Sequence, residues 1–475
     1  GAVAITGATL SASAGFTPAQ GDSFTLIDND GDDPVTGTFG GLAEGSLLTI
    51  GTRSYRISYA GGTGNDVVLT VVPAVTDANI SISGATGTGG AFRIGDTVTA
   101  TWNSTAGGDN NGALTGVTVD FSQFGGGSAV SASNSSGTWT ASYTIVAGTI
   151  ETTGRNVSVT ASGPNGTSAT AADTTGAAVD TVTATVTGAT SSTADGSYKA
   201  GGTISIQVAF SQAVTVTGTP LLTLETGTTD RAASYASGSG TSTLTFTYTV
   251  QAGDTSADLD FASATALALN GGSIVDGAGN AATLTLATPG ATGSLGANKA
   301  IVIDTTAPTL GAAALTAATD SGSSSTDGIT NAANPAFSLT VGEAGLTLEL
   351  LRGTTVVATA TSTAGTNTLT HTGAAEGTGL SYTVRATDAA GNQTTSNAVT
   401  VTIDRTAPTI SDVANQTIEE DAGTGALSVT VGDGVTAAGT VQLTRGSGNT
   451  TLVADSAVVL GGSGSGRTVT VTPTA

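Results

Sequence analysis

The sequence contains no cysteine, no methionine and a single histidine in 475 residues. The absence of cysteine excludes a disulfide framework and thiolate metal sites. Without cysteine and methionine the chain also lacks the side chains that oxidise most readily, which suits a protein outside the cell. Aromatic residues make up 4% of the chain and charged residues 10%, both low for a globular enzyme. Because large side chains are scarce, we expect thin hydrophobic cores, such as form between two facing sheets.

Basic residues are also few, with 12 Lys and Arg against 35 Asp and Glu and a net charge of −23. This balance argues against nucleic acid as a partner, because neutralising phosphates takes clustered Lys and Arg. It argues equally against binding to anionic membrane surfaces. The acidic residues leave two interpretations open: solubility through self-repulsion, or binding of divalent cations.

Long hydrophobic runs are absent as well. No segment approaches the roughly 20 apolar residues of a membrane span, and no signal peptide is found. The chain begins on Gly1 and stops at Ala475, just after the strand-like TVTVTP, so we expect a fragment of a longer polypeptide. Several domains are expected at this length, since one core rarely grows past about 250–300 residues.

The dominant pattern is strict alternation of apolar residues with threonine or other polar residues, as in Ile204, Ile206, Val208 and Phe210. Period two with one polar face is typical of half-buried strands. Clusters of turn-forming residues separate these runs, namely GGDNNG (107–112), GPNG (163–166), DGAGN (276–280) and DAAGN (388–392). No stretch of useful length has helical spacing. The sequence therefore predicts an all-β chain.

Internal repeats indicate the architecture. VIDTTAPTL (302–310) and TIDRTAPTI (402–410) are near copies, and FRIGDTVTATW (92–102) aligns with YKAGGTISIQVAF (198–210). A repeat of about 100 residues with several short strands is the size of an immunoglobulin-like sandwich. Proline after the last strand ends pairing and stiffens a short joint. We predict an extended row of modules with these boundaries: 74–180, 181–304, 305–404 and a truncated module at 405–475, after a different segment at 1–73.

Catalytic constellations are weak. A serine nucleophile needs a positioned base, and His371 is the only histidine. Paired carboxylates could hydrolyse glycosides, with Asp258 and Asp260, or Glu419, Glu420 and Asp421, as nominal candidates. Such sites usually add aromatic platforms, whereas Trp102 and Trp139 stand in alternating strand contexts that favour core packing. We predict a protein that is not an enzyme.

Calcium suits the polar loops, because Ca²⁺ takes roughly six to eight oxygen ligands from carboxylates, amides and backbone carbonyls. Three kinds of candidate site follow. The first pairs each turn with the joint aspartate after it: Asp276 and Asn280 with Asp304, and Asp388 and Asn392 with Asp404. The second lies in DSGSSSTDGITN and comprises Asp320, Asp327 and Asn331. The third is DNDGDD, with Asp28, Asp30, Asp32 and Asp33. In all three, Asx turns that cap their own backbone without an ion are the alternative.

Several of these motifs carry a resemblance to known families. The TDAAGN turn, the IDxTAPT joints and the DSGSSSTDGITN loop resemble bacterial Ig-like (Big-type) modules of giant adhesins and biofilm-associated proteins. SDVANQTIEEDAGTGALSVTVGD (411–433) resembles a cadherin-like repeat. SFTLIDNDGDDPVTGTFGG (23–41) resembles the end of an autotransporter or haemagglutinin-like passenger, which implies that residues 1–73 are the end or cap of a β-solenoid. The resemblance implies extracellular stalks whose joints are stiffened by Ca²⁺.

Our functional prediction is a structural or adhesive stalk on a bacterial cell surface or in a secreted protein. Its partner would be a host, abiotic or neighbouring-cell surface, or a second copy in homotypic assembly. Two alternatives stay open. One is a self-assembling filament or layer subunit, and the other is a set of glycan- or protein-binding modules of a large secreted hydrolase.

Overall fold

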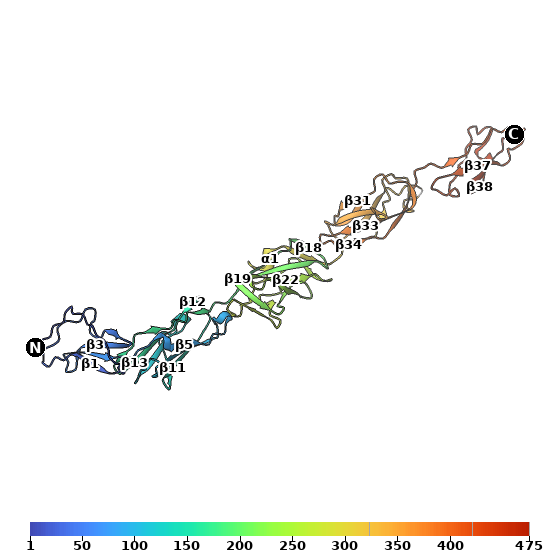
Figure 1. The fold of residues 1–475 in the computed structure, drawn as a ribbon. Coiled ribbons are helices and arrows are strands. Elements are labelled where there is room, and N and C mark those ends of the chain that lie inside the picture. The colour runs from blue at the N-terminus through green and yellow to red at the C-terminus, as the bar shows by residue number, and fades with distance from the viewer. Residues whose placement is uncertain (323, 420, 475) are drawn as a thin grey trace.

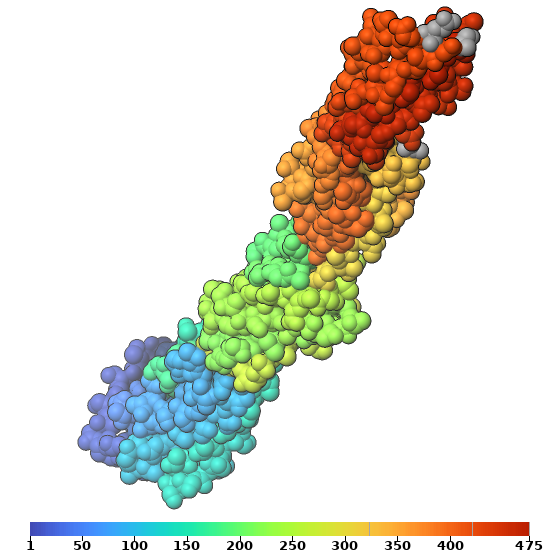
Figure 2. Space-filling view, turned by 90° about the vertical axis from the view of Figure 1, so that its right-hand side faces the viewer, coloured from blue at the N-terminus to red at the C-terminus, as the bar shows by residue number. Residues whose placement is uncertain are grey.

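The computed structural model describes every residue except Ser323, Glu420 and Ala475. It confirms the all-β prediction: within the described residues the α-helical content is one four-residue helix, α1 (Leu295–Asn298). Each sheet draws its strands from one of five consecutive stretches of chain. The resulting five units follow one another in an extended row from the N-terminus to the C-terminus (Figure 1). The space-filling view shows the same elongated shape (Figure 2).

The first unit is a four-stranded sheet in the order β1-β4-β3-β2. Its strands are β1 (Ser23–Ile27), β2 (Leu47–Ile50), β3 (Arg53–Gly61) and β4 (Asp66–Val71). All three strand pairings are antiparallel, and Ile57 and Val67 are fully buried between the sheet and the preceding chain. The structure does not support the predicted β-solenoid end, because a solenoid stacks its strands in parallel.

The second unit is a sandwich with two main sheets, β10-β11-β7-β5 and β14-β13-β8-β9. Trp102 and Trp139 lie directly opposite each other on β7 and β11 and are 1% and 9% exposed. They share one hydrophobic cluster with Val119 and Val159 of the facing sheet, so the prediction that the tryptophans pack in a core is confirmed. The strands are β5 (Ile80–Ser83), β6 (Phe92–Arg93), β7 (Thr97–Asn103), β8 (Gly116–Asp120), β9 (Val130–Ser131), β10 (Ser133–Ser135), β11 (Thr138–Thr144), β12 (Glu151–Arg155), β13 (Ser158–Gly163), β14 (Gly166–Thr167), β15 (Ala171–Ala172) and β16 (Ala177–Asp180).

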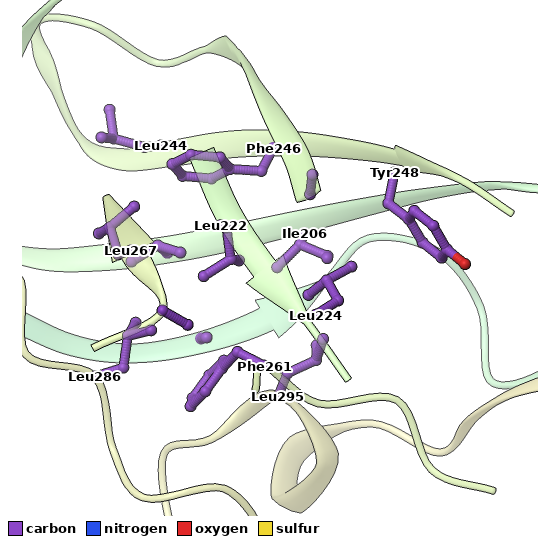
Figure 3. Close-up of a cluster of buried hydrophobic side chains, with 14 of the residues drawn as sticks. Ile206, Leu222, Leu224, Leu244, Phe246, Tyr248, Phe261, Leu267, Leu286 and Leu295 are labelled. Carbon is purple, nitrogen blue, oxygen red and sulfur yellow. The ribbon is translucent and has the colours of Figure 1, made fainter. Parts of the chain in front are cut away.

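The third unit has the largest core. Leu222, Leu224, Phe246, Phe261 and Leu295 converge between the long strands and α1 (Figure 3), and each is at most 1% exposed. Burying one such side chain contributes about 1.5–3 kcal/mol. Its strands are β17 (Val186–Ser191), β18 (Gly196–Tyr198), β19 (Thr203–Thr217), β20 (Leu221–Leu224), β21 (Arg231–Ser237), β22 (Thr241–Thr249), β23 (Thr255–Ser256), β24 (Leu267–Ala268), β25 (Ser273–Val275) and β26 (Ile301–Asp304).

The fourth unit packs the sheet β27-β29-β32 against the sheet β28-β35-β33-β30-β31. Phe337 of β29 stacks on Tyr382 of β33 with ring centroids 4.5 Å apart, and both side chains are fully buried. Its strands are β27 (Ala314–Leu315), β28 (Ile329–Thr330), β29 (Ala336–Val341), β30 (Thr347–Arg352), β31 (Thr355–Thr361), β32 (Gly365–Thr370), β33 (Gly377–Thr387), β34 (Gln393–Thr395) and β35 (Val399–Ile403).

The fifth unit is a single sheet, β36-β37-β39-β38. Among its described residues, Val429 and Val431 are the buried hydrophobic side chains, while Ile410 and Leu452 are 61% and 57% exposed. This unit therefore has little core of its own. Its strands are β36 (Thr409–Ile410), β37 (Leu427–Gly432), β38 (Val458–Ser463) and β39 (Gly466–Val471).

Candidate functional site

Side-chain hydrogen bonds link neighbouring units at the joints. At the first joint, Arg53 of β3 donates from Nη1 to Asp109 O (3.0 Å) and from Nη2 to Asn110 O (2.9 Å). Asn111 pairs with the backbone of Ala74, accepting from Ala74 N at 2.9 Å and donating to Ala74 O at 2.7 Å. Arg53 is only 4% exposed. The GGDNNG loop thus acts as the docking surface for the first unit.

Asp109 holds that loop to its own unit. Its carboxylate accepts from Thr76 N (2.9 Å), Asn79 Nδ2 (2.8 Å) and Trp102 Nε1 (2.6 Å). The sequence marked this segment only as a turn and gave no role to Arg53. The contact between Arg53 and the GGDNNG loop could not be predicted, because no repeated motif or fixed spacing in the sequence connects the two.

At the second joint, the DGAGN turn of the third unit docks on the second unit. Asp276 Oδ1 accepts from the backbone N–H groups of Ala278, Gly279 and Asn280 at 2.8–3.0 Å, which is an Asx turn. Asn280 then accepts from Ile94 N at 2.8 Å and donates to Asp180 O at 3.3 Å. The turn is locked inside its own unit and presents Asn280 to the neighbour.

A basic side chain closes this joint. Arg93 donates from Nη1 to Gly279 O at 2.6 Å. The carboxyl group of Asp180 is buried close by, and this burial, with smaller effects from the charges of Asp276 and Glu151, raises its pKa above the usual value. The joint therefore combines one cationic side chain with acidic groups on both sides of the boundary.

The third joint repeats the second. Asn392 donates to Asp304 O at 2.9 Å, and Lys199 donates from Nζ to Gly391 O at 2.8 Å. Asp388 accepts from Asn392 N at 2.8 Å on one carboxylate oxygen and from Asn392 Nδ2 at 2.9 Å on the other. The turn after β33 is thus used in the same way as the turn after β25.

The prediction that each turn pairs with the joint aspartate after it is wrong. Each turn contacts the joint aspartate of the preceding module instead. Asn280 contacts Asp180 and not Asp304, and Asn392 contacts Asp304 and not Asp404. The reason is the direction of the last strand: β35 runs antiparallel to β33, so that Ile403 lies beside Gly377, at the opposite end of β33 from the turn. Each turn therefore faces the joint before its own unit, and Asp404 faces the fifth unit.

The fourth joint is built from other groups. Thr436 donates from Oγ1 to the Asp404 carboxylate at 2.6 Å. Asp433 accepts from Val435 N and Thr436 N at 2.8 and 2.7 Å, and these two bonds lower the pKa of its carboxyl group. Arg405 points back to the fourth unit, where it donates to Ala374 O at 2.8 Å.

The 320–331 loop offers the best fit for a cation among the predicted calcium sites. Asp320 is 5% exposed, and its Oδ1 has no hydrogen-bond donor among the described residues. Asp320 and Asp327 line one side of a cavity of about 410 Å³. An unpaired buried carboxylate oxygen is costly, and a hard cation would satisfy it. Asn331 turns away, however, accepting from Ser321 Oγ at 2.7 Å.

The other predicted ligands fit a cation less well. At the two turns, the chain's own donors already occupy oxygens of Asp276, Asn280 and Asp388. In DNDGDD the loop is held by buried Asn29, whose N–H donates to Asp66 Oδ1 at 2.9 Å. Asp28, Asp30, Asp32 and Asp33 are all exposed. In the part of the chain that the structure describes, no three acidic or histidine side chains converge.

His371 and Asp260, two of the nominal catalytic residues, form hydrogen bonds within their own units. His371 Nδ1 lies 2.9 Å from Tyr382 Oη, and burial, with a smaller effect of the Arg352 charge, lowers the pKa of its imidazole. Asp260 accepts from Phe261 N (2.8 Å), Gly290 N (2.9 Å) and Leu295 N (3.2 Å), and so organises the start of α1. Glu420 lies outside the described residues.

Comparison with known proteins gives one family match. Residues 306–405, which cover the fourth unit, match the bacterial Ig-like domain family. The fourth unit is thus Ig-like, as predicted. No curated protein sequence matches the chain.

The solved structures that match the chain are distant from it. They include three domains, FN1–FN3, of chicken CNTN1 (9% identity, TM-score 0.22, covering 68% of this chain and 97% of that one). The eight N-terminal Ig domains of Down syndrome cell adhesion molecule also match (10%, TM-score 0.22, 89% and 54%). A third is the BSP domain of a biofilm-associated protein (11%, TM-score 0.17, 83% and 91%). Scores of this size support no argument about function. Among the described residues, no helix is long and apolar enough to cross a membrane.

Proposed function

We propose that this chain is a non-enzymatic structural spacer of a bacterial cell-surface or secreted protein. The observation that carries the proposal is the row of β-units whose joints are bridged by side chains of both neighbours, Arg53, Arg93 and Lys199 among them. Bridged joints keep the row of units extended, so that the distance between its two ends grows with the number of units. A spacer needs this property and an enzyme does not. The bacterial Ig-like match of residues 306–405 agrees with such a role.

Surface display is tested on intact cells that produce the whole natural protein. A spacer that projects from the cell exposes every unit, so antibodies against separate units should label unpermeabilised cells. Labelling that appears only after permeabilisation would contradict the proposal. The partner at the far end, whether another surface or a second copy, stays a proposal that adhesion and aggregation assays on the same cells address.

We also propose that Ca²⁺ binds the 320–331 loop, with Asp320 and Asp327 as ligands. Binding of an ion to the folded state stabilises it by about 2.7 kcal/mol at a hundredfold excess over the dissociation constant. Calcium should therefore raise the melting temperature of the fourth unit, and Asp320→Asn should abolish that rise. Asp258→Asn, outside this loop, serves as the matched control and should keep it. A calcium response that survives Asp320→Asn would reject this site.

Calcium at the joints is a separate proposal. If ions stiffen them, excess EDTA should make the whole chain more flexible in small-angle scattering and easier to cleave near Asp304 and Asp404. Scattering and cleavage unchanged by EDTA would leave hydrogen bonds as the agents that hold the joints.

A further inference from the structure

The second and third joints are each bridged by a basic side chain from an equivalent position. Arg93 and Lys199 follow an aromatic residue at equivalent positions of the aligned segments that begin at Phe92 and Tyr198. Each donates to the carbonyl of the glycine in the next unit's turn, Gly279 or Gly391, at 2.6 and 2.8 Å. Since only 12 basic residues serve the 475-residue chain, the repeated use of this position needs a physical reason.

The turn explains how the glycine carbonyl becomes available. Gly279 and Gly391 have φ of +96° and +87°, a region that glycine enters without steric cost. The carboxylate at the start of each turn takes up turn N–H groups, three by Asp276 and that of Asn392 by Asp388. The glycine carbonyl remains for a donor from outside the turn, and a cationic donor makes a stronger hydrogen bond than a neutral one.

Strand register explains where that donor comes from. The last strand of a unit pairs in parallel with a short strand near its start: β16 with β6, β26 with β18, and β35 with β28. Arg93 lies directly beside Asp180 in the first of these pairs. Tyr198 lies beside Ile303, which brings the following residue, Lys199, level with Asp304. The basic side chain thus starts at the joint aspartate and needs to span only the boundary.

Among the residues that the structure describes, no basic side chain stands level with the joint aspartate at the fourth joint. Thr330 lies beside Ile403, so the residue level with Asp404 is Asn331. Its side chain accepts from Ser321 within the 320–331 loop, and Arg405 points back into the fourth unit. Figure 1 shows a short single stretch of chain between the fourth unit and the fifth, on the side of the fourth unit away from β34.

We propose that the basic residue level with the joint aspartate is a latch that fixes the angle between neighbouring units, and that the joint after Asp404, which has no latch, is the hinge of this chain. The inference concerns the mechanics of the spacer proposed above. Its test measures joint geometry alone, in EDTA, and so can succeed or fail independently of surface display and of calcium.

The experiment uses the full chain, which has no native cysteine, with pairs of spin labels at exposed positions. Ala236→Cys with Thr359→Cys spans the third joint, and Thr359→Cys with Ser463→Cys spans the fourth. Pulsed electron resonance gives the distribution of distances for each pair. We expect a narrow distribution across the third joint and a broad one across the fourth.

Lys199→Ala should then broaden the distribution across the third joint, with the population of bent conformers rising about threefold, as for loss of one exposed charged contact. Lys199→Arg should keep it narrow. Lys299→Ala is the matched control, because Lys299 pairs with Asp195 inside the third unit at 2.7 Å, and it should change neither joint.

Circular dichroism melting establishes that the units of each variant are folded. Equal widths for the two joints in the unsubstituted chain would overturn the hinge. An unchanged third joint in Lys199→Ala would overturn the latch.

Discussion

The third and fifth units follow the same alternating pattern yet differ in what they bury. In the third unit, Phe246 and Leu295 are fully buried within one large cluster, whereas the fifth unit buries Val429 and Val431 and leaves Ile410 exposed. The joints differ in the same sense, since Lys199 of the third unit reaches across its boundary and no basic side chain reaches the fifth unit among the described contacts. Alternation therefore specifies strands, but the number of large side chains on the inner face decides how firmly a unit is held.

The largest expected effect is the loss of a core aromatic. Phe246→Ala should destabilise the third unit by about 3–5 kcal/mol, the cost of removing a fully buried phenylalanine. Val429→Ala in the fifth unit removes two methylene equivalents and should cost about 1.5 kcal/mol. Chemical denaturation followed by far-ultraviolet circular dichroism measures both losses of stability. Similar costs for the two substitutions would erase the contrast between the units.

A smaller effect is expected at the buried polar network of the third unit. Tyr248 donates to Asp254 Oδ2 at 2.6 Å, and Arg231 donates to Oδ1 at 2.8 Å. Tyr248→Phe should therefore cost about 1–2 kcal/mol. In Tyr143→Phe, the lost hydroxyl serves only an exposed contact to Gly125 O, and the cost should be within about 0.5 kcal/mol. Equal losses would show that the network adds nothing.

The same network gives a dependence on pH. Burial opposes ionisation of Asp254, but the hydrogen bonds from Tyr248 and Arg231 outweigh it and hold the pKa of the carboxyl below its ordinary value. Because the folded-state pKa is lowered, its contribution to stability is present above the unfolded value and is lost as the pH falls through the folded one. Acid titration of unfolding should show this loss below about pH 4, and Tyr248→Phe should move it to higher pH.

The smallest effect is expected on the exposed face of the fifth unit. Ile410 is 61% exposed, so Ile410→Thr should change stability by no more than about 0.5 kcal/mol. The matched change Ile301→Thr, at a fully buried position of the third unit, should be severe because it buries a hydroxyl group. Thermal unfolding of both variants makes the comparison. A large loss from Ile410→Thr would reveal a contact of that side chain in solution.

Periodicity was sufficient to predict the strands and the core tryptophans. The run from Ile204 to Phe210 forms the buried face of β19, and Trp102 and Trp139 pack as expected. It was insufficient for the joints. The turn at 388–392 ends 12 residues before Asp404, and the antiparallel run of β35 in between carries the chain to the other end of the unit. Local sequence gives the order of these features and not the end of the sandwich at which each one lies.

The parallel pairing of closing strands has a mechanical consequence. In the second, third and fourth units the chain leaves through β16, β26 or β35, each lying along a short strand of its own unit. A pull on the two ends of the chain would therefore load these strands lengthwise, in shear, so that several interstrand hydrogen bonds share the tension at once. Peeling a strand from its edge would instead break those bonds one at a time at low force.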